Sequence, residues 1–287
     1  MKVWMDGEVR DAAEATVSVF DHGLLYGDGV FEGIRVYSGR IFRAAAHVDR
    51  LFEGARAIRL PVPIGKDDLI AAMNETLRAN KLTDGYIRLI VTRGAGTLGL
   101  NPFKCSKPRV IIIADTIALY DEDVYEKGMS VIISSVPRNS TNALDPRVKS
   151  LNYLNNILAR MEAVDAGVSE AIMLNAAGMV AEATGDNVFI VRDGVLITPP
   201  PHAGILAGIT RGVVLDLAGQ VDIPVAQRDL TRYDLYTADE CFLTGTAAEI
   251  VPVTAINART IGDGVVGPVT RRLKDAFHAL VRSEQRD

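Results

Sequence analysis

The sequence predicts a two-domain protein of mixed α/β and α+β class, and three observations support this fold class. Short β-branched runs alternate with amphipathic helical patterns along the chain. The 287 residues, 48% of them apolar, suffice for a full core without disulfides or metal. The stretch 117–127, IALYDEDVYEK, loses the apolar pattern and gains acids, so we expect an interdomain loop there. It would join a smaller N-terminal α/β domain, 1–116, to a larger C-terminal domain, 128–287.

The first domain opens with strands separated by turn residues, followed by two helices and two further strands. The strands are expected at 3–5, 16–19, 29–37, 40–42, 86–92 and 109–114. Apolar residues recur at helical spacing over 46–59 and 67–79. Val48, Leu51 and Ala55 mark the inner face of the first helix.

The second domain is expected to begin with a strand at 130–134 and a helix from about 151 to 166, which Gly167 ends. Leu151, Leu154, Leu158 and Met161 are the predicted inner face of that helix. The remaining expected elements are strands at 171–174, 179–183, 187–191, 195–197 and 240–243, and helices at 210–218 and 269–281.

Composition and residue patterns argue against nucleic acid, metal and membrane as partners. Lys plus Arg total 31 against 36 Asp plus Glu, and no basic run provides a nucleic-acid footprint. Cys105 and Cys241 match neither a zinc spacing nor a redox pair, so we expect free thiols and no metal site. No apolar run reaches the roughly eighteen residues of a membrane span, and the start lacks the pattern of a signal peptide. A cytoplasmic location without membrane partners is the expectation.

Three segments could bind a phosphorylated ligand. GAGTLG at 94–99 fits a dinucleotide fingerprint after a strand, but LNPF follows it where a helix is required, so a glycine-rich loop is favoured over a nicotinamide oxidoreductase. Residues 207–211 lead directly into a helix, and 245–248 follow a strand with small residues. Both could present backbone amides to a small phosphate, although either alone is more often a cap or a turn.

Lys149, Glu182 and the pair Tyr86 and Arg88 are the other candidates for chemistry. Lys149 lies between a strand and a helix, and a helix beginning there would place Tyr153 on its face, so it could be a Schiff-base nucleophile or a solvated lysine. Glu182 lies in an apolar strand, where burial would require a cationic partner such as a protonated pyridine. Strand alternation places Tyr86 and Arg88 together on one face, either for a carboxylate or for solvent.

These segments together resemble the fold-type IV pyridoxal-phosphate enzymes, and within them the branched-chain amino acid aminotransferases. The matching runs, which extend the resemblance over nearly the whole chain, are LYGDGVFEGIR at 25–35, YIR at 86–88, 149–153, EATGDNVF at 182–189, 208–211 and 245–249. The resemblance implies pyridoxal 5′-phosphate as cofactor, branched-chain L-amino acids and 2-oxoglutarate as substrates, and at least a homodimer with active sites completed across the interface.

The resemblance also implies residue roles. Lys149 matches the lysine that forms the Schiff base and moves the substrate proton, and Glu182 matches the acid that pairs with the pyridine nitrogen. The other cofactor-binding matches are Arg50, Tyr153, Leu206, Gly208, Ile209, Thr210 and Thr246. The substrate-binding matches are Tyr26, Phe31, Tyr86, Arg88, Tyr120 and Ala247. Periodicity alone would place Arg50 on the surface.

Fold siblings of these enzymes are D-amino acid aminotransferases, R-selective amine transaminases and aminodeoxychorismate lyases. The run YGDGVFEG at 26–33 together with YIR favours the branched-chain member. A binding protein without catalysis is a further alternative, in which Lys149 would be idle.

Overall fold

A computed structural model describes residues 1–117 and 119–284. Its internal contacts divide the chain into two compact units. The first unit contains Met1–Ile117 and Val148–Asn152, and the second contains the rest of the described chain. The two domains that we predicted, with boundaries at 116 and 128, stay a prediction.

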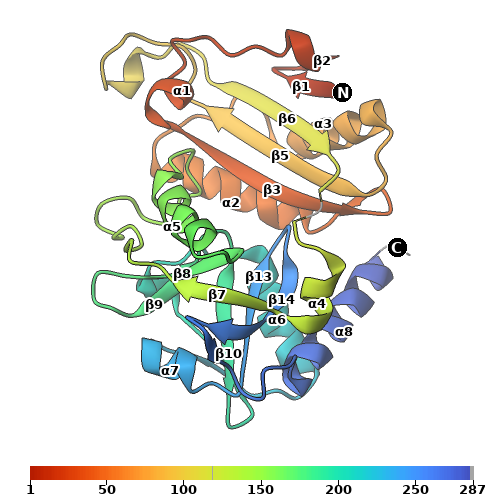
Figure 1. Cartoon of the computed structure of the whole chain (residues 1–287). Helices are drawn as coiled ribbons and strands as arrows, with labels where there is room; N and C mark the ends of the chain where they lie inside the picture. The colour runs from red at the N-terminus through yellow and green to blue at the C-terminus, as the bar shows by residue number, and fades with distance from the viewer. Residues whose placement is uncertain (118, 285–287) are drawn as a thin grey trace. The chain divides into compact units, whose positions relative to one another are not determined.

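The first unit is a six-stranded antiparallel sheet with two helices on one face (Figure 1). In sheet order the strands are β2 (Glu8–Asp11), β1 (Lys2–Met5), β6 (Arg109–Asp115), β5 (Gly85–Thr92), β3 (Gly29–Tyr37) and β4 (Arg40–Ile41). The helices are α1 (His22–Tyr26), α2 (Ala44–Ala57) and α3 (Lys66–Asn80), with 3-10 turns at Ala12–Glu14 and Pro102–Lys104. One core joins α2 and α3 to alternate residues of β3, β5 and β6. The alternation that we predicted for β5 is confirmed.

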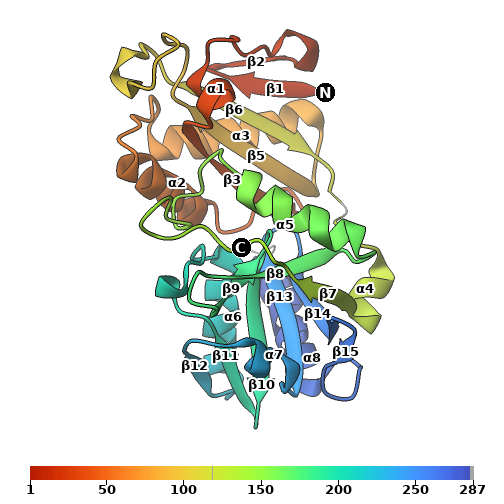
Figure 2. The same cartoon turned by 60° about the vertical axis from the view of Figure 1, so that its left-hand side comes forward.

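The second unit is a nine-stranded mixed sheet with helices against it (Figure 2). In sheet order the strands are β12 (Val225–Gln227), β11 (Val195–Thr198), β10 (Asn187–Arg192), β13 (Glu240–Gly245), β14 (Glu249–Ile256), β7 (Met129–Ile133), β8 (Glu170–Leu174) and β9 (Val180–Ala183), with β15 (Arg259–Thr260) on β14. The helices are α4 (Glu122–Lys127), α5 (Leu154–Asp165), α6 (Ile209–Gln220), α7 (Arg232–Tyr236) and α8 (Pro268–Glu284), with a 3-10 turn at Pro201–Ala203. Within residues 1–117 and 119–284, no helix is long and apolar enough to cross a membrane.

The structure corrects two predicted segments. Residues 16–19 form no strand, because the Ser18 hydroxyl accepts the Phe20 N–H and the Ser18 carbonyl accepts the Asp21 N–H, which begins a turn. The segment 117–127 is not wholly a loop, because it contains α4. Acids in the first turn of α4 and Lys127 in its last turn complement the helix dipole, and Val124 and Tyr125 pack against the core of the second unit.

The predicted inner face of the helix after Lys149 is also wrong. Helix α5 begins at Leu154 and buries Asn156, Ala159 and Ala163. The small alanines allow close approach to β8, whereas the leucine-rich side faces outward. Helical periodicity identified two faces, but it could not tell which of them the sheet covers.

Candidate active site

The face of β3 and β5 opposite α2 and α3 carries three predicted substrate residues. Phe31, Tyr86 and Arg88 alternate with core residues of these paired strands, so they share this face. The Arg88 guanidinium carbon lies 4.6 Å from the centre of the Phe31 ring and 5.7 Å from that of Tyr86. A Cβ on Gly33 would lie 1.7 Å from the Tyr86 hydroxyl oxygen, so only glycine lets this ring cross β3. The predicted pairing of Tyr86 with Arg88 on one face is confirmed.

Lys149 joins the same face through backbone pairing. The Phe31 N–H donates to the Lys149 carbonyl at 2.9 Å, and the Leu151 N–H donates to the Gly29 carbonyl at 3.0 Å. The Lys149 amine lies 4.6 Å from the centre of the Phe31 ring. The expectation that Lys149 begins a helix and shares its face with Tyr153 is therefore wrong. Lys149 pairs with β3, whereas Tyr153 is the N-cap residue of α5 and belongs to the second unit.

Arg50 is not on the surface, contrary to its helical periodicity. Its side chain is 11% exposed, and its Nε and Nη2 atoms donate to the two carboxylate oxygens of Glu32 at 2.7 and 2.8 Å. His47, one turn earlier on α2, is hydrogen bonded to the same carboxylate at 2.8 Å. Burial alone would raise the pKa of Glu32, but Arg50 and His47 lower it to about 2. We did not select Glu32 or His47 from the sequence, although an acid in an apolar strand was the available signal.

In the second unit, Glu182 is buried on β9 and accepts hydrogen bonds from three residues. Its Oε1 accepts from Arg138 Nε at 3.0 Å, and Arg138 Nη2 is ion-paired with the same oxygen at 2.9 Å. Its Oε2 accepts from Asn187 Nδ2 at 3.1 Å and from the Leu206 N–H at 2.9 Å. Arg138 also donates to the Asn156 side chain at 3.1 Å. The cationic partner that we expected for a buried Glu182 is present in the protein itself, and sequence reasoning missed it because Arg138 lies in a loop with no periodicity.

The two segments that we expected to bind an anion flank the start of β10. Gly208 is the N-cap of α6, which begins at Ile209, one residue before its predicted start, and a Cβ on Gly208 would lie 2.1 Å from Asn187 Oδ1. A Cβ on Gly245, just before the turn that holds Thr246 and Ala247, would lie 1.8 Å from Asp186 Oδ1. Both loops therefore approach two adjacent residues so closely that only glycine fits.

The second unit also contains Thr210 and Tyr120 of the predicted site, and the first unit contains Tyr26. Thr210 is buried in the first turn of α6, next to Ile209. Burial raises the pKa of the Tyr120 phenol in the second unit, and the Asp186 carboxylate acts in the same direction. In the first unit, the Tyr26 hydroxyl donates to the Leu98 carbonyl at 2.6 Å.

The glycine run 94–99 does not support dinucleotide binding. It is followed by the turn Pro102–Lys104 and then by β6, so no helix N-terminus is available for a pyrophosphate. Gly94 has a φ of +84° and begins this loop.

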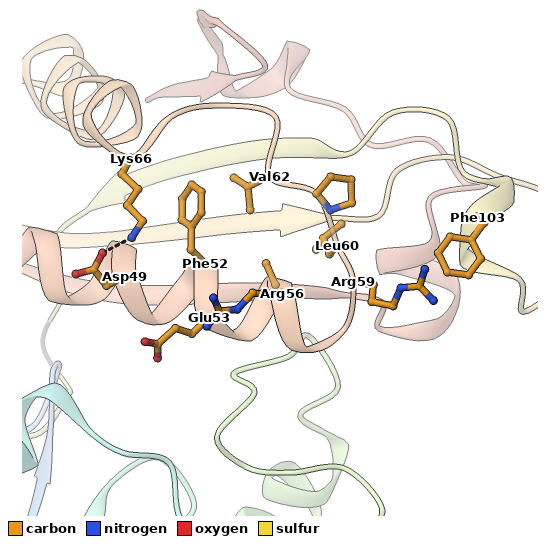
Figure 3. Close-up of a pocket in the computed structure, with 11 residues that line it drawn as sticks. Asp49, Phe52, Glu53, Arg56, Arg59, Leu60, Val62, Lys66 and Phe103 are labelled. Atoms are coloured by element: carbon orange, nitrogen blue, oxygen red, sulfur yellow. Dashed lines mark hydrogen bonds and ion pairs between the residues drawn. The ribbon is translucent and has the colours of Figure 1, made fainter.

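A cavity of about 990 Å³ in the first unit contains none of the predicted site residues (Figure 3). Its lining includes Asp49, Phe52, Glu53 and Arg56 from α2. His47 and Arg50 belong to another face of the same helix, so this cavity is not the candidate active site.

Comparison with known proteins identifies the family. The Amino-transferase class IV family matches residues 29–256. A Methanocaldococcus jannaschii protein, whose name places it provisionally among the branched-chain-amino-acid aminotransferases, is 52% identical over 96% of this chain and 95% of its own length. The branched-chain-amino-acid aminotransferase of Pseudomonas aeruginosa is 41% identical over 97% of this chain and 92% of that protein.

Solved structures agree with this result. The Escherichia coli branched-chain amino acid aminotransferase superposes with a TM-score of 0.95 at 38% identity, covering 98% of this chain and 94% of that chain. The chain therefore belongs to the class IV aminotransferases, in the branched-chain-amino-acid aminotransferase family.

Proposed function

We propose that this aminotransferase uses pyridoxal 5′-phosphate to move an amino group between Leu, Ile or Val and 2-oxoglutarate. Two solved structures of one relative support the substrate pair. A branched-chain amino acid aminotransferase from T.th. has been solved with N-(5′-phosphopyridoxyl)-L-glutamate and with 4-methylvaleric acid, and both chains are 40% identical to this one. The side chain of the first ligand ends in a carboxylate, whereas the second ligand has a branched apolar chain. The two half-reactions require a pocket that accepts both kinds of side chain.

The observation that carries the proposal is the cluster on β3 and β5. A primary amine and a guanidinium, Lys149 and Arg88, both lie 4.6 Å from the centre of the Phe31 ring. An amine can act as a Schiff-base nucleophile, and a guanidinium can bind a carboxylate of an amino acid. Tyr86 adds a phenol to the same face.

The second unit fits the cofactor's phosphate and ring nitrogen. Gly208, Ile209 and Thr210 would offer the N-terminal amides and hydroxyl of α6, whose dipole favours an anion, and Thr246 would offer the turn after β13. The narrow approaches at Gly208 and Gly245 leave no room for side chains there. Glu182, whose ion pair with Arg138 and hydrogen bonds from Asn187 and Leu206 favour its ionised form, would accept the N–H of the pyridine ring.

The proposed reaction assigns a role to each group. Bound pyridoxal phosphate supplies an electron sink for the charge that develops at the substrate Cα. Lys149 would hold the cofactor covalently and, once the substrate amine has taken its place, would move the proton between Cα and the C4′ carbon. Arg50, Tyr153 and Leu206 would complete the cofactor's binding set, as phosphate ligand, partner of the ring hydroxyl and packing residue.

The substrate pocket would be formed by Tyr26, Phe31, Tyr86, Arg88, Tyr120 and Ala247. Apolar walls would accept branched side chains, whereas Arg88 would bind the distal carboxylate of glutamate. A fixed cation in the middle of the pocket would penalise an apolar substrate, and the stacking of Arg88 on two aromatic rings keeps it at one wall.

The purified protein tests the reaction directly. It should be yellow, should bleach with hydroxylamine, and should lose its visible absorbance band in a single turnover with L-Leu, L-Ile or L-Val. Greater reactivity with D-alanine or an R-amine would assign it to a fold sibling. A colourless protein that stays colourless after incubation with pyridoxal phosphate would contradict the proposal.

Replacing Arg88 by leucine should separate the two half-reactions. The half-reaction with glutamate should lose at least about 2 kcal/mol of transition-state stabilisation, the contribution of a charge-assisted hydrogen bond. The leucine half-reaction should change much less, and it serves as the internal control. Stopped-flow absorbance measures both. Equal losses would mean that Arg88 binds the α-carboxylate that both substrates carry.

We also propose a homodimer, in which a second copy covers the outward face of α5. Five apolar side chains on this face are between 44% and 64% exposed: Leu154, Ile157, Leu158, Met161 and Val164. Their spacing forms one continuous stripe, and an isologous dimer would place two such stripes together. Such a stripe is unusual on the surface of a monomer.

Val164→Glu should weaken the dimer at least about tenfold, since the interface would bury an unpaired charge. Val265→Glu is the matched control, because Val265 is equally exposed at 63% and lies outside the stripe. Sedimentation velocity measures both. A monomeric parent protein, or equal association of the two variants, would exclude α5 as the interface.

We propose a cytoplasmic location because neither cysteine forms a disulfide in the described structure. Cys105 and Cys241 are unbonded thiols, and such thiols are typical of a reducing compartment.

A further inference from the structure

Glu32, His47 and Arg50 form a buried trio in the first unit. Glu32 lies on β3, while His47 and Arg50 lie one turn apart on α2, and the Glu32 and His47 side chains are fully buried. Glu32 Oε1 accepts from Arg50 Nε at 2.7 Å. Glu32 Oε2 accepts from Arg50 Nη2 and is hydrogen bonded to His47 Nδ1, both at 2.8 Å.

The geometry of the trio indicates which of its atoms carry protons. An ionised carboxylate can only accept, so His47 Nδ1 must donate. Burial lowers the pKa of His47 although Glu32 opposes this, and the ring is therefore neutral with its proton on Nδ1. Its Nε2 atom is buried and has no hydrogen-bond partner within the described part of the chain. A buried acceptor without a partner destabilises the fold. A contribution to stability therefore does not explain why a histidine lies at position 47.

The contacts of the trio suggest what His47 does. Glu32 cancels the charge of Arg50. The trio therefore affects the orientation of the Arg50 guanidinium more than the net charge around it. The side-on pair, made by the Nε and Nη2 atoms of Arg50, fixes the guanidinium relative to the carboxylate. The carboxylate could still turn about its own terminal bond, and the third hydrogen bond, from His47, fixes that plane.

We propose that His47 is a positioning residue that acts through Glu32 to aim the Arg50 guanidinium at the phosphate of pyridoxal phosphate. This inference rests on the proposed role of Arg50 as a phosphate ligand. His47 itself does not contact the reacting atoms. Its contribution is the Nδ1–H donor, and not its size or its second nitrogen.

Two amide substitutions separate these properties. His47→Asn places an N–H donor near the position of Nδ1 and removes Nε2, whereas His47→Gln places its amide near Nε2 and leaves Glu32 without this donor. Full-length apoprotein of each variant is titrated with pyridoxal phosphate, and ³¹P NMR of the holoprotein reports on the phosphate. We expect His47→Gln to raise the cofactor Kd about tenfold, the loss of one charge-assisted hydrogen bond, and to shift the ³¹P signal. His47→Asn should restore both values.

The thermal midpoint of the apoprotein controls for a merely structural role. An unchanged Kd and ³¹P signal in His47→Gln, with or without a lower midpoint, would overturn the inference. So would equal cofactor losses in both variants, because the donor would then not be the property that matters.

The double variant Glu32→Gln/Arg50→Met tests the underlying assignment separately, because it removes both buried charges together. If Arg50 binds the phosphate, the cofactor Kd of the double variant should rise about a hundredfold, because a charge-assisted contact with the phosphate is lost. A parental Kd here would overturn the role of Arg50 and the role of His47 with it. A raised Kd here together with a parental Kd in His47→Gln would overturn only the role of His47.

Discussion

Lys149→Ala should abolish transamination and leave the protein folded. Without the amine, the site loses the group that would bind the cofactor covalently and move the Cα proton. The fold should survive because Lys149 is attached to β3 through its backbone, and the contact of its amine with the Phe31 ring contributes about 0.5–1 kcal/mol. The turnover number should fall by more than about a hundredfold, the lower end of general acid–base effects.

Lys66→Ala is the control for this variant. Its ammonium pairs with the exposed Asp49 carboxylate at 2.6 Å and is half exposed, so activity should not change. Near-ultraviolet circular dichroism checks the fold of both variants. More than about a hundredth of the parental activity in Lys149→Ala would remove this residue from the mechanism.

Glu182→Gln should reduce turnover far more than it weakens cofactor binding. The substitution keeps the volume but removes the charge that would hold the pyridine nitrogen protonated, and the electron sink is weakened. We expect a loss of at least about a hundredfold in turnover. The amide also meets the donors of Arg138, Asn187 and Leu206, which it cannot all accept, so the thermal midpoint should fall as well.

Glu240→Gln separates catalysis from stability. Glu240 is a buried carboxylate that accepts the Val269 and Thr270 N–H groups at the start of α8, so its loss should lower the midpoint but leave turnover nearly intact. Turnover of Glu182→Gln follows from stopped-flow absorbance and its cofactor Kd from titration. Unchanged turnover with a raised Kd would show that Glu182 holds the cofactor without assisting the reaction.

The spacing of apolar residues located most helices and strands, because that spacing depends only on the local geometry of the backbone. Alternation in β5 separated Ile87 and Leu89 from Tyr86 and Arg88, and the structure has this arrangement. The start of α6 could likewise be predicted to within one residue, since the end of a helix is a local property. The fold-type IV resemblance was visible from runs distributed over nearly the whole chain, and the comparisons confirm the family.

Tertiary structure decided which partner each side chain has. The sequence identified the apolar stripe of α5 but not the side that the sheet covers, because alanines there pack more closely than leucines. Arg50 has the periodicity of a surface residue, and only the contact of α2 with β3 places it against Glu32. Arg138 reaches Glu182 from a position 44 residues earlier, across a separation that no local pattern records. A single sequence shows the local preferences of each segment, whereas the pairing of buried charges depends on which segments become neighbours in the fold.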